Sequence, residues 1–204
     1  MSGERVWICS DTHFGHESIF KHCKRPFATV KEMDEFIIEN WNKVVEKHDH
    51  IYILGDFAFN NHLKYITALR GKKHLIIGNH DSMNKECLNR FVSACHYKQI
   101  KYGNRFFELT HCPMRTWNDC HRGNIHLFGH THGRMKTYNL SFDIGIDTNG
   151  CKIYNMEDIM NMVKKREEEM IENKRISIID GKKTYFQDDL KYFEYLLAKR
   201  GVKC

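Results

Sequence analysis

Six short apolar runs recur along the chain and predict six buried or half-buried strands. They are Val6–Cys9, Ile51–Leu54, His74–Ile77, Phe106–Leu109, Ile125–Phe128 and Phe142–Ile146. We therefore expect short strands to supply much of the core.

Apolar residues at helical spacing predict two helices among the first strands. The first helix carries Met33, Phe36, Ile37, Trp41, Val44 and Val45. The second carries Leu63, Ile66 and Leu69, and Gly71 is expected as its left-handed C-cap. Strands and helices alternate early and strands then dominate, which favours an α/β sandwich of layered sheets.

The C-terminal part of the chain predicts two helices and a hairpin. A helix from Met156 to about residue 175 would bury Met156, Met160 and Met170 and expose the acidic run 167–169. Residues 176–179 and 184–186 flank Asp180-Gly181, which suits a tight turn. A last helix would carry Leu190, Phe193, Leu196 and Leu197. We expect residues 1–174 to form one domain, with 175–204 as a hairpin and helix packed on it.

Composition indicates an ordinary globular chain. At 204 residues and 41% hydrophobic content, it suits one domain with a sizeable core. The N-terminus has no apolar segment of signal-peptide length, and no membrane-length apolar run occurs, so we expect a cytoplasmic protein without membrane contact. Eight cysteines without a C-x-x-C pair argue against a zinc ribbon or a disulfide framework.

Five of the six apolar runs end in groups that can bind metal. These groups are Asp11-Thr12-His13, Gly55-Asp56, Gly78-Asn79-His80-Asp81, His111 and Gly129-His130-Thr131-His132. Ligands bind at the carboxyl ends of strands in α/β sheets, so these residues can meet despite their separation in sequence. Carboxylate, imidazole and amide oxygen together suit manganese, iron, zinc or nickel better than calcium.

The order of these motifs, D-x-H, GD, GNHD, H and GHTH, resembles that of the calcineurin-like metallophosphoesterase superfamily from about Val6 to Tyr154. The chain is also similar to its small single-domain bacterial and phage branch. That similarity rests on Asp11–His16, Arg25-Pro26-Phe27, Leu54–Phe57 and His111-Cys112-Pro113. The resemblance implies a layered α/β/β/α sandwich with a short C-terminal hairpin-helix extension.

The resemblance also implies a binuclear centre of two divalent transition metals, with manganese expected first and iron, nickel or zinc as alternatives. The first metal would be held by Asp11, His13, Asp56 and His132, and the second by Asp56, Asn79, His111 and His130. Asp56 would bridge them, a metal-bound hydroxide would attack the phosphorus, and His80 would assist the leaving oxygen.

Two departures from related enzymes narrow the comparison. Phe59 stands where purple acid phosphatases have a tyrosine ligand, so no ferric tyrosinate is expected. The GD motif continues as Phe57-Ala58-Phe59-Asn60, without the D-R-G of Ser/Thr protein phosphatases. The aspartate that orients the catalytic histidine in those enzymes is therefore missing, and Asp81 is a candidate substitute.

Three further residues are candidates for substrate binding: Arg115, His16 and Arg25. An arginine can bind a phosphate through two parallel hydrogen bonds, although a solvated arginine is the default. Trp117 is expected to be a packing anchor rather than a stacking platform. Asp143 and Asp147 are expected to hydrogen-bond near the metals rather than to bind them.

We therefore expect a phosphoesterase that hydrolyses a phosphodiester or another small phosphoester, with diesters favoured and a nucleotide as the candidate substrate. One alternative is a nuclease acting on DNA or RNA ends. The net charge of +6 permits nucleic-acid binding without implying it. Another alternative is a non-catalytic metal-bound scaffold for protein contacts. The sequence does not specify the oligomeric state.

Overall fold

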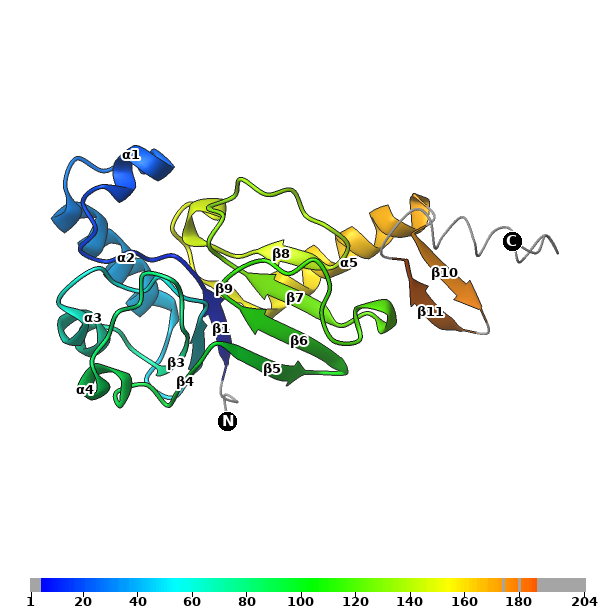
Figure 1. Cartoon of the computed structure of the whole chain (residues 1–204), viewed down its shortest axis with the longest axis horizontal. Coiled ribbons are helices and arrows are strands. Elements are labelled where there is room, and N and C mark those ends of the chain that lie inside the picture. Colours follow the sequence, from blue (N-terminus) through cyan, green and yellow to red (C-terminus); the bar gives the residue numbers. More distant parts are fainter. Residues whose placement is uncertain (1–4, 174, 180, 187–204) are drawn as a thin grey trace.

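Two β-sheets packed face to face form the body of the protein. A computed structural model describes residues 5–173, 175–179 and 181–186. The first sheet has five strands in the order β4-β3-β2-β1-β9, and the second has four in the order β5-β6-β7-β8 (Figure 1). A separate two-stranded hairpin, β10-β11, extends from the far end of this body (Figure 1).

The first sheet is parallel except at one edge. It comprises β1 (Val6–Cys9), β2 (His50–Ile53), β3 (Lys72–Ile76), β4 (Ser93–Cys95) and β9 (Tyr154–Asn155). Strands β1 to β4 pair in parallel, whereas β9 pairs antiparallel with β1. The ends of β1 and β2 are therefore level, with Cys9 opposite Ile53. This register puts the segments that follow both strands at the same edge of the sheet.

Helices cover the outer face of the first sheet. They are α1 (Ile19–Cys23), α2 (Val30–Val44), α3 (His62–Ala68) and α4 (Lys85–Leu88). Helix α2 starts where the Thr29 side chain accepts a hydrogen bond from the Glu32 amide, a favourable N-cap. Its fully buried Met33, Ile37 and Trp41 pack in one cluster with residues of β1 and β2. This apolar face holds the helix on the sheet.

The second sheet closes a core between the two sheets. It comprises β5 (Tyr97–Tyr102), β6 (Arg105–Thr110), β7 (Ile125–Phe128) and β8 (Ser141–Asp143). Phe107, Leu109 and Leu127 from this sheet lie in one cluster with Ile8 of β1 and with Leu54, which directly follows β2. All five are completely buried. Strands β6, β7 and β8 run parallel, so their carboxyl ends also share one edge.

Two short helices, one long helix and a hairpin complete the described fold. They are the short helices η1 (Cys120–Arg122) and η2 (Ile146–Thr148), the long helix α5 (Met156–Glu172) and the hairpin strands β10 (Ile176–Ile179) and β11 (Lys182–Tyr185). Helix α5 begins with a capping box between Asn155 and Asp158. It contacts β9, β1 and β10 and adds Met156, Ile159 and Val163 to the inter-sheet core.

The structure confirms the predicted metallophosphoesterase-type α/β sandwich, with two corrections to its details. Helix α3 ends in an extended C-cap at Leu69, so Gly71 is not its cap, although Gly71 does have a φ of +95°. Glu167 was expected in solvent but is buried, because Arg105, Lys183 and Tyr185 all bind its carboxylate. The expected last helix, with Leu190 to Leu197, lies outside the described residues.

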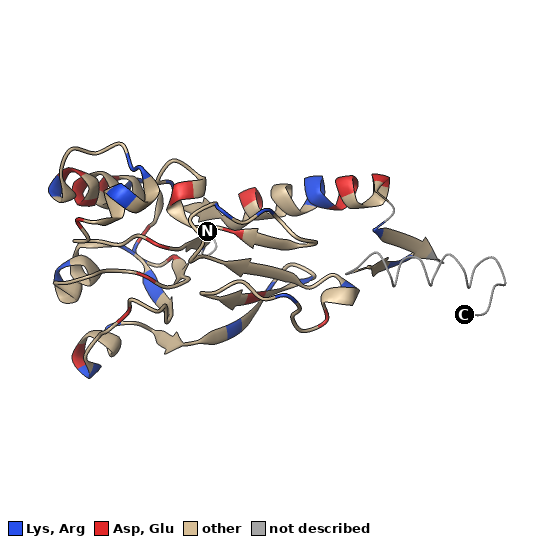
Figure 2. Ribbon diagram, turned by 45° about the horizontal axis from the view of Figure 1, so that its top comes forward, with Lys and Arg blue, Asp and Glu red and all other residues tan. Residues whose placement is uncertain are grey.

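Charge is distributed over the whole fold. Acidic and basic side chains both occur along the helices, and basic residues also occur on strands and connecting segments (Figure 2). None of the helices in the described part of the chain combines the length and apolarity needed to cross a membrane.

The C-terminal hairpin is tied to the body through Tyr185. Its hydroxyl donates to Glu167 at 2.5 Å, and its ring packs against Gly123, where an added Cβ would lie 2.5 Å from the Tyr185 ring.

We predict that removing residues 175–204 lowers the melting temperature but keeps metal binding. Loss of even about 1 kcal/mol corresponds to about 2–4 °C at this size. Tyr185→Ala should reproduce part of the loss, whereas Ile178→Ala, at a 56% exposed position, should not. A truncated protein that is folded yet binds no metal would contradict this.

Candidate active site

The segments that follow β1 and β2 are joined by backbone hydrogen bonds. The Asp11 amide donates to the Gly55 carbonyl at 3.0 Å, and the His13 amide donates to the Asp56 carbonyl at 2.9 Å. The two sequence motifs D-x-H and GD therefore lie side by side. Strands β6 and β7 deliver His111 and His130 to the same region, because Gly129 donates to the His111 carbonyl at 2.9 Å.

Many of the candidate ligands have an unusual backbone conformation. Positive φ angles occur at Asp11 (57°), His13 (49°), Asp56 (52°), His130 (66°) and His132 (49°). Residues other than glycine rarely adopt this left-handed backbone conformation, and such strain concentrates at functional sites. At these positions the sharp turns direct the side chains into one cluster.

Glycine makes the close approach of these segments possible. A Cβ at Gly129 would lie 1.9 Å from Ser10 Oγ and 2.3 Å from Asp11 Oδ2. A Cβ at Gly78 would lie 2.4 Å from Asp56 Oδ1. No side chain fits at either position, so the glycines of the GNHD and GHTH motifs are required by packing.

A first cluster joins Asp11, His13 and His132 around Asp56. One donor atom from each of Asp11, His13 and His132 lies within 4.8 Å of the other two. His13 Nε2 is 3.5 Å from Asp56 Oδ2, and His132 Nε2 is 4.0 Å from Asp11 Oδ1. These are the four residues that the resemblance implies for the first metal.

A second cluster joins Asn79, His111 and His130 to the same Asp56. Asn79 Oδ1 lies 2.8 Å from His111 Nε2 and 3.0 Å from His130 Nδ1. His111 Nε2 lies 3.5 Å from Asp56 Oδ1. Ligand atoms about 2.1 Å from one ion and at right angles would be about 3 Å apart. The spacing of the second group thus suits one ion, and Asp56 directs one oxygen to each cluster.

The His111 ring is fixed with one nitrogen toward the site. Its Nδ1 lies 2.8 Å from the Leu54 carbonyl, which can only accept, so Nδ1 carries the proton. Burial opposes a charged His111, but the hydrogen bond and charge of Asp56 outweigh it and raise the His111 pKa, so positive charge is favoured at Nε2. A cation bound by Nε2 and the Asn79 carbonyl oxygen would supply that charge.

The His13 side chain is the best test of whether a metal fits. Its Nδ1 contacts His16 Nδ1 at 3.0 Å, so Nε2 faces the cluster. Nε2 is buried and has no hydrogen-bond partner among the described residues. Burial also lowers the pKa of His13, which favours the neutral ring that binds metals. An unpaired buried polar atom is costly, and coordination to a cation would satisfy it.

The pKa values around Asp11 also favour a cation. Burial raises the pKa of the Asp11 carboxyl to about 6. Burial works against a charged His132, but the hydrogen bond to Asp147 and the nearby Asp11 outweigh it and raise the His132 pKa to about 10. The position of His132 therefore favours positive charge. A divalent ion would supply that charge and replace the proton.

Asp147 orients His132, as its sequence position suggested. His132 Nδ1 lies 2.8 Å from Asp147 Oδ2, which leaves Nε2 for the site. Such a carboxylate fixes the tautomer and direction of a metal-binding imidazole. Asp143 anchors the same segment by accepting hydrogen bonds from Thr131 Oγ1 and the Gly133 amide.

The contacts of Arg25 favour a supporting role over the substrate binding predicted from the sequence. Its guanidinium contacts both Asp147 oxygens, the carbonyls of Asp11 and Thr12, and Met33 Sδ. These contacts use all of its N–H donors, and its side chain is only 1% exposed. Breaking a buried ion pair costs about 3–5 kcal/mol, more than the roughly 1.5–3 kcal/mol of a charged hydrogen bond to substrate. Arg25 therefore supports the first cluster from behind.

His80 and His16 lie on the open side of the first cluster. The rings of His80 and His16 lie 5.6 Å and 5.1 Å from that of His13, and His80 is exposed. The His80 amide donates to Asp56 Oδ1, which positions its backbone. His16 also stacks on Phe59 at 4.4 Å, so the residue at the tyrosine-ligand position forms part of the site's outer rim.

Asp81 has a structural role that the sequence did not reveal. Its two carboxylate oxygens accept hydrogen bonds from the backbone amides of Asp56, Phe57 and Gly78. Its carboxylate therefore joins the GD and GNHD segments. These bonds do not orient the His80 ring.

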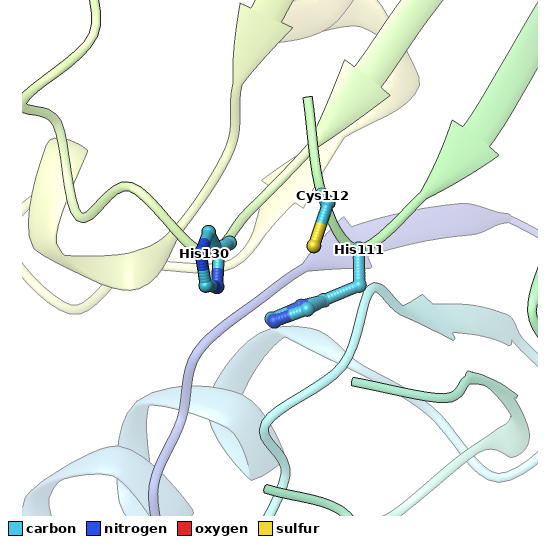
Figure 3. Close-up of side chains that lie close together, drawn as sticks. All are labelled: His111, Cys112 and His130. Atoms are coloured by element: carbon cyan, nitrogen blue, oxygen red, sulfur yellow. The ribbon is translucent and has the colours of Figure 1, made fainter. Parts of the chain in front are cut away.

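Two cysteines near the clusters were not identified from the sequence. Cys112 lies beside His111 and His130 (Figure 3), with its Sγ within 4.8 Å of a nitrogen of each ring. Cys23 lies equally near His132 and Asp147. The only sequence signal was the position of Cys112 directly after a ligand. Trp117 is a packing residue, as expected: it is 6% exposed and its indole donates to the Asn124 carbonyl.

Comparison with known proteins agrees with this geometry. The model of the calcineurin-like phosphoesterase family matches residues 4–183. The chain belongs to this family. Calcineurin-like phosphoesterases are metal-dependent phosphoester hydrolases, which agrees with the clusters of metal-binding side chains described above.

Relatives within the calcineurin-like phosphoesterases include proteins of similar length from an archaeon and a phage. An uncharacterised protein of Methanocaldococcus jannaschii is 28% identical over 177 residues, covering 81% of this chain and 94% of that protein. The gene 66 protein of Mycobacterium phage L5 is 28% identical over 201 residues, covering 80% and 96%. A solved structure of a protein of unknown function from Aquifex aeolicus has a TM-score of 0.63 at 24% identity, covering 78% and 100%. This last likeness supports the fold.

We predict that Asp56→Asn and Asp147→Asn have different effects on metal content. Asp56 contributes to both clusters, so Asp56→Asn should lose both ions. Asp147 binds Arg25 and, among the candidate ligands, only His132, so Asp147→Asn should weaken the first site by about 10–100-fold and spare the second. Metal titration monitored by elemental analysis measures both. If Asp56→Asn retained two ions at wild-type affinity, Asp56 would not be shared.

Proposed function

We propose that this protein is a binuclear phosphodiesterase that cleaves a small phosphodiester. One observation carries the proposal: two clusters of metal-binding side chains share Asp56, whose two oxygens lie 3.5 Å from His13 Nε2 and His111 Nε2. A single carboxylate placed between two groups of metal-binding side chains suits a pair of divalent cations. When bound, such a pair lowers the pKa of a shared water and stabilises the attacking and leaving oxygens.

The charge of the site is suited to a pair of divalent ions. Burial raises the Asp56 pKa, but the hydrogen bond and charge of His111 outweigh this and lower it, so Asp56 is ionised. Asp11 provides a second buried carboxylate, and the remaining ligands are neutral when metal is bound. The centre therefore retains net positive charge, which attracts a phosphate anion and stabilises charge developing on it. Manganese is proposed as the native ion, with iron, nickel and zinc as alternatives, because the donors combine carboxylate and amide oxygens with imidazole nitrogens.

The chain's own residues divide the remaining tasks. Asp147, itself bound by Arg25, orients the His132 ring. His16 contacts the Nδ1 of His13 and so orients that ring. Asp81 joins the two segments that carry Asp56 and Asn79. His80 is free to approach the leaving oxygen and to donate a proton to it. Asn79, His80 and His130 are exposed, so the site opens to solvent. An open site can admit a group on each side of the phosphorus, which supports a diester over a monoester.

The same observations argue against a non-catalytic scaffold. A protein-binding surface has no need for the buried, partnerless Nε2 of His13 or for backbone strain at Asp11 and Asp56. A nuclease that acts on DNA or RNA ends would use the same ligands. Short oligonucleotides therefore belong in any substrate screen beside nucleotides and cyclic nucleotides.

We expect metal removal to abolish activity. The protein should cleave bis(p-nitrophenyl) phosphate, lose this activity on exhaustive chelation and regain it with manganese, because the clusters supply no other source of activated water. Initial rates of nitrophenolate release follow the reaction, with metal content measured in parallel. Undiminished activity in metal-free protein would refute the two-metal mechanism.

We expect His80→Ala to lower kcat by about 10²–10⁴-fold without loss of metal, as is typical when acid-base assistance is removed. The backbone bond from residue 80 to Asp56 survives this change, so the fold should survive too. The defect should be smaller for a nitrophenyl ester, whose leaving group needs little protonation, than for an alkyl diester. His48→Ala, at another exposed histidine, is the control. Equal defects for both leaving groups would mean that His80 only stabilises charge.

A further inference from the structure

A cavity of about 400 Å³ lies between the segments that follow β6 and β7. It is lined by residues 113–115, Met135, Lys136 and Tyr138, with the buried Phe128 and Ser141 at its floor. Its volume falls within the range of about 300–1,000 Å³ found for small-molecule sites.

The cavity adjoins the second metal cluster. Pro113 follows the candidate ligand His111 by two residues, and Phe128 precedes His130 by two. Consecutive Cα atoms are about 3.8 Å apart, so each of these cavity residues has its Cα within about 7.6 Å of that of a ligand. The cavity thus lies next to two ligands of the second cluster, as a site for another part of a phosphate-bearing molecule requires.

The lining combines apolar surface with positive charge. Phe128 is 2% exposed in the floor, while Met135 is 46% exposed at the rim, a high value for a large apolar side chain. Arg115 and Lys136 are the charged residues of the lining, and no carboxylate lines the cavity. The chemistry therefore suits an anion with a planar or apolar organic group.

Arg115 differs from the other arginines near the core. Arg25, Arg105 and Arg166 each bind a carboxylate. Arg115 instead lies over the Tyr138 ring, at 5.1 Å from its centroid, and forms no ion pair with any described residue. A guanidinium stacked on an aromatic ring is held in place while its N–H donors remain available.

We propose that this cavity binds the nucleoside part of a nucleotide substrate, with Arg115 and Tyr138 as the residues that recognise it. This rests on the proposed phosphodiesterase function and names the substrate class of the same site. A nucleobase stacks on a planar guanidinium or aromatic face, and the ribose-phosphate places negative charge near Arg115. A flexible lipid chain has no planar face, so it would gain little affinity from stacking on Arg115 or Tyr138. Arg115 thereby keeps the substrate-binding role expected from the sequence.

The test compares two ligands that differ only by the nucleoside. Methylphosphonate and the 5′-methylenephosphonate analogue of AMP both resist hydrolysis. Calorimetry on the manganese-loaded full-length protein should show the nucleoside analogue binding at least about tenfold tighter, as expected from one stacking contact. The advantage should fall severalfold in Arg115→Met and in Tyr138→Leu. It should persist in Tyr138→Phe, which keeps the ring, and in the exposed control Arg90→Met.

Two results would overturn the inference: equal affinities for the two phosphonates, or an undiminished advantage in both Arg115→Met and Tyr138→Leu. Arg115 is exposed, so its variant should fold even if the half-buried Tyr138 variant does not. Metal content and diester cleavage of the wild-type sample test the proposed function separately. Nucleoside-dependent binding without bound metal would support the cavity and contradict the two-metal site.

Discussion

The burial of two carboxylates at the common edge of two sheets is the constraint on which the site depends. Asp11 and Asp56 are 0% and 2% exposed, and an unpaired buried carboxylate costs several kcal/mol. The protein compensates partly with backbone amides: His130 donates to Asp11, and His80 donates to Asp56. Imidazoles around them complete the environment, and a divalent cation would be the strongest remaining compensation. Level strand ends, glycine contacts and positive φ angles all serve to bring these groups within a few ångströms.

Arg25 shows how the fold maintains that arrangement. Its guanidinium binds the carbonyls of Asp11 and Thr12, in the segment where the backbone is strained, and also binds the carboxylate that orients His132. One buried cation thus stabilises both the turn and the imidazole direction. A permanent charge at this position also keeps Asp147 ionised: burial raises its pKa, but the bonds to His132 and Arg25 lower it to about 2. The Arg25–Asp147 ion pair therefore supports the site from behind, whereas His80 lies on its open side.

The sequence predicted the elements whose environment is uniform. Strands β1 and β7 are almost wholly buried, so their apolar runs are visible directly. Strand β5 was missed because its residues alternate between exposed and half-buried, and its sequence, YKQIKY, is largely polar. Buried charges were also beyond pattern recognition. Nothing in the sequence near Glu167 or Arg25 reveals partners that lie 62 or 122 residues away. The ligand motifs were recognisable because each lies at a strand end, but the supporting contacts depend on tertiary packing.

The contrast between Arg25 and Arg115 separates the architecture into two parts. At the carboxyl ends of β1, β2, β6 and β7, backbone amides and buried side chains hold Asp11, Asp56 and His132 in place. The segments 112–119 and 133–140 lie beyond these strand ends, and there Arg115 and Lys136 have no acidic partner among the described residues. A charged side chain without an ion pair adds little to folding stability, and under the proposed nucleoside binding Arg115 contributes to substrate affinity instead. Chemistry would then be set by the strand ends and substrate choice by the segments between them, so changes in those segments can alter specificity without disturbing the metal ligands.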